Sequence, residues 1–157
     1  MRHIRHSNDA GGSVGPIRWW TMLACVLLAA CSGDDREARR RAAGPSSDLA
    51  AHLRVANIDS GERLFGRCAA CHAIRRGATD RNGPTLFGVM GAPVAQVSAR
   101  FGYTAALQRV GGRWTPARMD AWLSNPQRFA PGTSMGFAGL ADPLDRADVI
   151  AYLQAQH

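Results

Sequence analysis

Residues 68–72 read Cys-Ala-Ala-Cys-His, and this stretch restricts the fold more than any other part of the chain. We expect residues 60–73 to be helical, so that the two cysteines and the histidine stand at positions i, i+3 and i+4. Side chains at that spacing emerge on one face of a helix. Cys68, Cys71 and His72 are therefore predicted to present two sulfur atoms and one imidazole to the same partner.

Three kinds of site use two cysteines separated by two residues. A thiol redox site of the thioredoxin type would need alternating strands and helices around the motif, and this pattern is missing. A zinc site would need further cysteine or histidine ligands, but beyond the motif the last 101 residues offer only His157. A histidine directly after the second cysteine is typical of covalent haem attachment, with thioethers at Cys68 and Cys71 and iron bound by His72.

A second motif, NPQRFAPGTSMGFAGL, occupies residues 125–140. It resembles the methionine loop of class I cytochromes c, NPxxFxPGTxMxFxGL. The resemblance implies that Met135 is the sixth ligand of the iron, which would raise the reduction potential and leave no position open to a substrate. An open or water-bound iron is the alternative, while Met90 and Met119 are predicted to fill the core. Helix-breaking residues predict a turn-rich loop without a helix, and these are Pro126, Pro131, Gly132, Gly136 and Gly139.

The resemblance to class I cytochromes c covers about residues 58–154. It implies an all-α fold with three main helices and long loops around one covalently bound haem c. In these proteins the first and last helices cross, with a glycine and an aromatic residue at the contact. Gly61 and Phe65 match these positions and are expected to face Tyr152 and Leu153. Glycine at a crossing allows two backbones to approach closely.

Two helix starts can be recognised from the residues alone. Thr115 followed by Pro116, and Asp142 followed by Pro143, combine a capping side chain with proline at the first helical position. The first of these helices must end before Pro126.

The resemblance also assigns residues around the cofactor. Pro84 would accept a hydrogen bond from the iron-binding imidazole through its carbonyl, which fixes the ring. Tyr103 and Trp114 match two donors to a haem propionate, and a plain core aromatic is the alternative for both. Thr133 matches a hydroxyl near the other propionate. Trp122 stands where the family commonly has a tyrosine near the methionine sulfur, and its indole can donate but not accept a hydrogen bond.

The N-terminal part has a different character. Residues 1–30 combine a basic start with an apolar run of about a dozen residues, which is too short to span a membrane and is typical of a signal peptide. Its end, Leu28-Ala29-Ala30-Cys31, resembles a bacterial lipoprotein signal, which implies lipidation of Cys31; a plain secretory signal is the alternative. Residues 31–56 are predicted to be a flexible polar linker, and residues 57–157 the cytochrome c domain.

The charged residues indicate little about partners. All 19 basic residues are arginine, and without residues 1–30 the chain keeps 16 of them against 11 acidic residues. No basic stripe interleaved with aromatic residues is present, so nucleic acid is not an expected partner. Candidates for a positive ring around an exposed haem edge are Arg67, Arg75, Arg76, Arg81 and Arg128, although each could be ordinary solvated surface.

These observations predict a monomeric electron carrier on the periplasmic side of a bacterial membrane, held there by lipid and exchanging single electrons with donor and acceptor redox proteins. No base, nucleophile or substrate pocket is visible, so no enzyme is predicted. Two alternatives stay open: a cytochrome subunit dedicated to one periplasmic dehydrogenase, and a haem c sensor or peroxidase with a labile sixth ligand.

Overall fold

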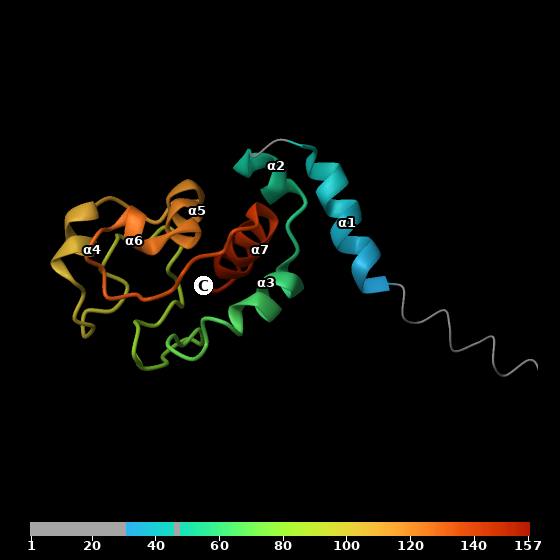
Figure 1. The fold of residues 1–157 in the computed structure, drawn as a ribbon. Coiled ribbons are helices and arrows are strands. Elements are labelled where there is room, and N and C mark those ends of the chain that lie inside the picture. The colour runs from blue at the N-terminus through green and yellow to red at the C-terminus, as the bar shows by residue number, and fades with distance from the viewer. Residues whose placement is uncertain (1–30, 46–47) are drawn as a thin grey trace, which may run out of the picture. The chain divides into compact units, whose positions relative to one another are not determined.

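The computed structural model describes residues 31–45 and 48–157, and these form helices joined by long loops (Figure 1). The predicted signal peptide, residues 1–30, lies outside the described residues. The chain divides into two compact units, Met1–Arg36 and Glu37–His157, and of the first unit only the start of the first helix is described. The helices are α1 (Cys31–Ala43), α2 (Leu49–Arg54), α3 (Ile58–Phe65), α4 (Ala105–Val110), α5 (Pro116–Ser124), α6 (Pro126–Phe129) and α7 (Pro143–Gln154).

Within residues 31–45 and 48–157 the only β pairing is an isolated bridge between Pro93 and Arg113. This part of the chain is all-α, as predicted, and α3, α5 and α7 are the three longest helices of residues 57–157. None of the helices in this part of the chain is long and apolar enough to cross a membrane.

The crossing of α3 and α7 forms as predicted, with the two helices side by side in Figure 1. A Cβ atom placed on Gly61 would overlap the carbonyl oxygen of Asp148 and lie 2.7 Å from the Cβ of Tyr152. The rings of Phe65 and Tyr152 pack with their centroids 5.4 Å apart, and Leu153 is buried beside them. Any side chain at position 61 would therefore prevent this close approach of α3 and α7. This steric requirement outweighs the low helix propensity of glycine.

The helix that leads into the cysteine motif is shorter than predicted. It starts at the Asn57 cap, ends at Phe65, and is followed by hydrogen-bonded turns rather than by a helix to residue 73. From Gly66 onward several amides bond three residues back, such as Cys68 N–H to Phe65 O at 2.7 Å, which is the tighter 3₁₀ pattern. The motif still closes on itself, because His72 N–H donates to Cys68 O at 2.9 Å.

Both predicted helix starts are confirmed. The hydroxyl of Thr115 accepts from the Arg118 amide and the carboxylate of Asp142 from the Leu144 amide, each with proline in the first helical turn.

The expectation of no helix in residues 125–140 is wrong for one turn, α6. Its first position is Pro126, where a missing N–H costs nothing, and the Asn125 side chain caps it.

The polar stretch before the domain also differs from expectation. Where a flexible linker was predicted, the structure has α1 and α2. Asp48 caps α2, which packs on α7 and buries Ala51 and His52. Composition pointed to a linker because the residues are polar, whereas in the structure Arg39 is paired with a buried acid of α7.

Candidate functional site

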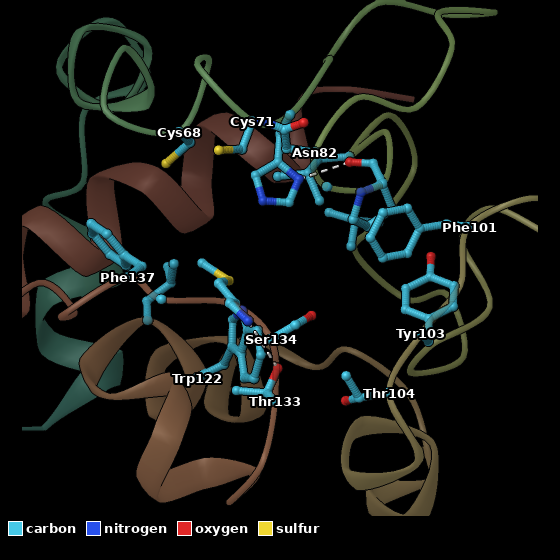
Figure 2. Close-up of a pocket in the computed structure, with 18 of the residues that line it drawn as sticks. Cys68, Cys71, Asn82, Phe101, Tyr103, Thr104, Trp122, Thr133, Ser134 and Phe137 are labelled. Atoms are coloured by element: carbon cyan, nitrogen blue, oxygen red, sulfur yellow. Dashed lines mark hydrogen bonds between the residues drawn. The ribbon is translucent and has the colours of Figure 1, made fainter.

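A single cavity of about 460 Å³ brings the predicted site residues together (Figure 2). Its size is in the range of small-molecule and cofactor sites, and its walls are mainly apolar. One wall carries the cysteine motif, and Figure 2 shows Trp122, Thr133 and Ser134 across from Cys71. The predicted site residues that line it are Cys68, Cys71, His72, Pro84, Tyr103, Trp122, Thr133 and Met135.

The imidazole of His72 is held in a fixed orientation. Its Nδ1 donates to the carbonyl oxygen of Pro84 at 2.8 Å, which confirms the hydrogen bond that the resemblance implied. A carbonyl only accepts, so the proton lies on Nδ1 and the lone pair of the neutral ring lies on Nε2. Burial lowers the pKa of His72, and the bond to Pro84 acts in the opposite direction. Both the tautomer and the neutral state suit an imidazole that binds a metal.

The two cysteine side chains differ in their surroundings. Both are free thiols in the described chain; Cys68 is half-buried and Cys71 is exposed. Burial raises the pKa of the Cys68 thiol, while nearby Arg67 lowers it to a smaller extent. No group of three or more His, Cys, Asp or Glu side chains that could hold a metal ion occurs within residues 31–45 and 48–157. A zinc site, one alternative for this spacing, therefore lacks its ligands there.

The opposite wall is a loop that carries Met135. Its backbone is tied to α6, because the side-chain amide of Gln127 donates to the carbonyl oxygens of Thr133 at 2.9 Å and of Met135 at 3.2 Å. The loop returns to α5 through a bond of 2.8 Å from Leu140 N–H to Leu123 O. Here Gly139 lies so close to α5 that a Cβ would overlap the Ser124 carbonyl oxygen.

Met119 borders the same cavity. It is 3% exposed and belongs to the core, as predicted, but it also lines the cavity. The cavity therefore offers two thioethers, of which one projects from the regular helix α5 and the other from the loop. Met90 is partly buried and packs against the core.

The predicted aromatic donors are placed differently. Tyr103 lines the cavity, and its hydroxyl accepts from the Ser98 amide at 3.1 Å. Trp114 is 5% exposed and is not among the lining residues. It packs behind the cavity, stacked on Phe129 with an interplanar angle of 22° and tilted toward Trp122. The structure thus gives Trp114 a core position.

Three supporting residues were not predicted from the sequence. Asp80 joins two loops, accepting from Thr85 N–H at 2.8 Å and from the Ser98 hydroxyl at 2.6 Å. Gln127 holds the methionine loop, and Gly83 makes room for the His72 ring. Only for Gly83 did a hint exist, in the Gly-Pro pair of the family pattern.

The five candidate arginines are all exposed. Arg67 lines the cavity and lies over the ring of Phe137, with 5.5 Å from its Cζ to the ring centroid. Arg76 lies over Phe87 in the same manner at 4.7 Å, and Arg81 donates to the Ala69 carbonyl oxygen at 2.8 Å. Several of these side chains are thus held by the domain rather than freely solvated.

A helical fold around an apolar cavity, with an oriented imidazole and two thiols on one wall and a thioether on the other, defines a c-type haem protein domain. Comparison with known proteins agrees. The cytochrome c family matches residues 58–156, and the chain belongs to this family. Its members bind one covalently attached haem c per chain.

Individual relatives come from bacteria and from plants. A cytochrome c homolog of Bradyrhizobium diazoefficiens is 39% identical over 114 residues, covering 73% of this chain and 62% of that protein. One from Rickettsia felis is 38% identical over 102 residues, covering 65% and 58%. The chain thus spans only about three fifths of the length of these relatives. The solved structure of cytochrome cH from Methylobacterium extorquens matches with a TM-score of 0.59 and 37% identity, covering 62% of this chain and 97% of that one.

Proposed function

We propose that this protein carries single electrons through one haem c, attached by thioethers at Cys68 and Cys71 and ligated by His72 and Met135. The observation that supports this most is the arrangement of the cavity, with the thiols and the Pro84-bound imidazole on one wall and the methionine loop on the other. The donor set of two sulfurs, one imidazole and one thioether fits haem c. When bound, the haem supplies an iron that changes between the ferric and ferrous states.

The protein's own residues set the conditions for that change. Pro84 holds His72 in one tautomer and strengthens its donation to a metal. A thioether from Met135 favours the ferrous state and so raises the potential. Trp122 borders the cavity where it can donate but not accept a hydrogen bond. The apolar walls exclude water, which also favours the less charged state of the site.

The number of protein ligands on the iron would distinguish an electron carrier from the main alternative, a haem c sensor or peroxidase. Cytochrome c homologues are electron-transfer proteins rather than enzymes, and an iron held by both His72 and Met135 would have no position left for a substrate. A sensor or peroxidase with a labile Met135 would instead bind carbon monoxide rapidly and completely in the reduced state at neutral pH. Slow or absent binding is the expected result.

The decisive experiment uses the holoprotein matured in a bacterium with a haem-attachment system. Intact mass should show one haem added, and the oxidised spectrum should show the weak far-red band of methionine ligation. Met135→Ala should abolish that band, whereas Met119→Leu, which alters the other thioether of the cavity, should keep it. A band lost with Met119→Leu and kept with Met135→Ala would overturn the assignment of the sixth ligand.

The membrane attachment is part of the same proposal. It is supported by the resemblance of Leu28-Ala29-Ala30-Cys31 to a lipoprotein signal, which would place lipid on Cys31 and the domain on the periplasmic side. Two or more acyl chains would make the attachment stable. The mass of the N-terminal peptide tests this directly, and Cys31→Ser should release an unacylated, soluble holoprotein.

The partners would be donor and acceptor redox proteins, met by the monomer at the edge of the haem near exposed Cys71. The exposed arginines there, Arg67 among them, would attract an acidic partner surface. Oxidation by a purified partner should then slow steeply as salt rises from about 20 to about 300 mM. A protein that co-purifies one to one with a dehydrogenase would instead be a dedicated subunit.

A further inference from the structure

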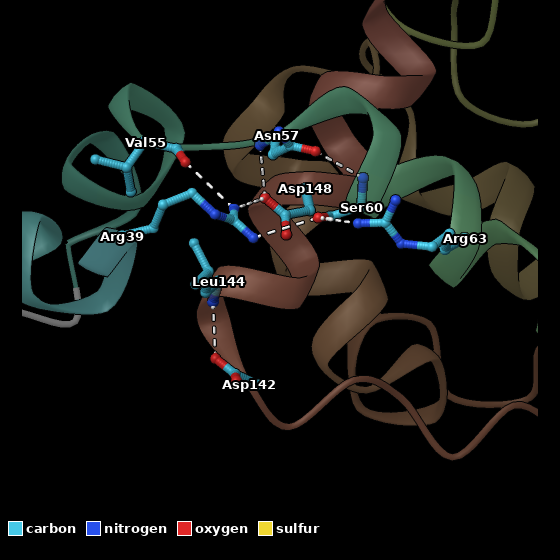
Figure 3. A network of polar contacts seen from close by, with 8 residues as sticks. All are labelled: Arg39, Val55, Asn57, Ser60, Arg63, Asp142, Leu144 and Asp148. Atoms are coloured by element: carbon cyan, nitrogen blue, oxygen red, sulfur yellow. Dashed lines mark hydrogen bonds and ion pairs between the residues drawn. The ribbon is translucent and has the colours of Figure 1, made fainter. Parts of the chain in front are cut away.

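The buried acid of α7 lies at the centre of a polar network (Figure 3). Asp148 is 0% exposed, and its Oδ1 accepts from a guanidinium nitrogen of Arg39 at 2.7 Å and from the Asn57 amide at 2.8 Å. Arg39 also donates to the Val55 carbonyl oxygen and the Ser60 hydroxyl, both at 3.3 Å. One side chain of α1 thus reaches the end of α2, α3 and α7.

The location of the network matters. The residues that match the cytochrome c family begin at 58, so Asp148 lies inside the family domain and Arg39 before it. Asp148 also contributes the carbonyl that faces Gly61 at the α3 and α7 crossing. A buried carboxylate is strongly unfavourable without a paired cation, so the domain's own acid requires the arginine of the extension.

Neighbouring contacts point the same way. Arg40 pairs with Asp142, the cap of α7, and α2 packs against α7. By contrast, the ion pair of Arg41 with Glu37 lies within α1, and its side chains are 65% and 56% exposed. Exposed pairs of this kind add little. Since a polar helix of 13 residues is marginal in water on its own, order in α1 must come from docking.

We propose that Arg39 acts as a latch: its ion pair with Asp148 fixes the N-terminal extension, residues 39–57, to the family domain. The extension is then an ordered part of the domain and not a flexible tether. With the latch closed, only residues 31–38 can separate an acylated Cys31 from the domain. Even fully extended they span at most about 29 Å, against roughly 90 Å for the 26 residues from 31 to 56. The domain then stays close to the membrane, so the redox partner that it meets must lie at the membrane surface. This consequence rests on the proposed lipid anchor, whereas the latch does not.

The latch is tested by hydrogen exchange of the mature holoprotein in detergent, read by mass spectrometry. Amides of residues 40–44, which include Gly44 N–H bonded to Arg40 O, should exchange about 100-fold slower than in an unstructured peptide. In Arg39→Ala this protection should be lost, while α5 keeps its own. Arg41→Ala is the matched control and should leave the protection of residues 40–44 unchanged.

Three results would overturn the latch: free exchange of residues 40–44 in the wild type, full protection of these residues in Arg39→Ala, or an equal loss in Arg41→Ala. If Arg39→Ala unfolds α5 as well, Arg39→Ala combined with Asp148→Asn leaves no buried carboxylate and is judged by the same outcomes. The mass of the N-terminal peptide and the haem absorbance of the same sample report on the anchor and the cofactor. A missing lipid or haem is therefore distinguished from an open latch.

Discussion

The ring of His72 lies directly against the backbone of Gly83. A Cβ atom added to Gly83 would overlap Cε1 of the imidazole and lie 2.7 Å from Nδ1. The Gly83 amide also donates to the carbonyl oxygen of Cys71 at 2.9 Å, so the chain closes around the motif from both sides. The next residue, Pro84, provides the acceptor for Nδ1. The orientation of the ring is thus determined by packing as well as by a hydrogen bond.

Gly83→Ala should therefore push the imidazole out of position. We expect a loss of about 1–3 kcal/mol in the unfolding free energy of the holoprotein, the usual cost of overpacking, together with a shift of the reduction potential. Guanidinium unfolding and potentiometry would measure the two effects. Gly102→Ala is the control, because nothing lies within 4 Å of a Cβ at Gly102. Equal effects of both substitutions would contradict the steric role of Gly83.

Asp80 is expected to affect the His72 imidazole indirectly, through the loop that carries Pro84. It accepts from Thr85, directly after Pro84, and from Ser98, so it joins the Pro84 loop to the loop of Tyr103. Asp80→Ala leaves the Thr85 amide without its acceptor and should cost about 1–3 kcal/mol of unfolding free energy.

Ser98→Ala removes only one of the two bonds to Asp80 and serves as the comparison. It should cost about 0.5–1.5 kcal/mol, less than Asp80→Ala. Guanidinium unfolding at neutral pH measures both variants. The same stability for Asp80→Ala and the wild type would show that the two loops hold their positions without the carboxylate.

Gln127 should control how readily the methionine loop opens. Gln127→Ala removes two hydrogen bonds to this loop. With a net value near 1 kcal/mol for the pair, carbon monoxide should bind the reduced protein about 5-fold faster. Stopped-flow mixing gives the rate. Gln108→Ala, which removes a comparable side-chain bond to the Tyr103 carbonyl, should leave it unchanged.

Alkaline pH should weaken the fold through its two tyrosines. Burial raises the pKa of both Tyr103 and Tyr152 above the usual value near 10, with a smaller contribution in the same direction from Asp80 and Glu62 respectively. Above about pH 10 the unfolded chain releases tyrosine protons that the folded protein keeps, so stability falls as pH rises toward the folded pKa.

The measurement is the unfolding free energy between about pH 9 and about pH 11. The chain has no lysine, so no lysine titration obscures this window. Tyr103→Phe should show a shallower decline than the wild type. A decline as steep as in the wild type would place the effect elsewhere.

The parts of the fold that follow from local rules could be predicted. The caps at Thr115 and Asp142 and the close approach at Gly61 depend on a few neighbouring atoms, and the structure has all three. The end of α3 could not be predicted well. After Phe65 the backbone changes from α-helical to tighter hydrogen bonds, and the two patterns differ little in energy for the residues that follow.

Residues that act over long distances along the chain were missed. Arg39 and Asp148 are 109 positions apart, and a polar extension looks like a linker until its partner is known. Trp114 matches a family position, but whether an indole faces a cavity or packs behind it depends on neighbours such as Phe129. The site motifs were easier, because Cys68, Cys71 and His72 are contiguous in the sequence.

The bond between Leu140 N–H and Leu123 O has a consequence for how such proteins can diversify. It brings the two ends of residues 125–139 together, so this segment is a closed loop between α5 and the approach to α7, with α6 as its only helical turn. The imidazole side of the cavity belongs to a separate piece of chain. The segment that carries Met135 is therefore separable from the segment that holds His72. Under the proposed ligation by Met135, substitutions in residues 125–139 should shift the reduction potential while the bond from His72 to Pro84 is kept.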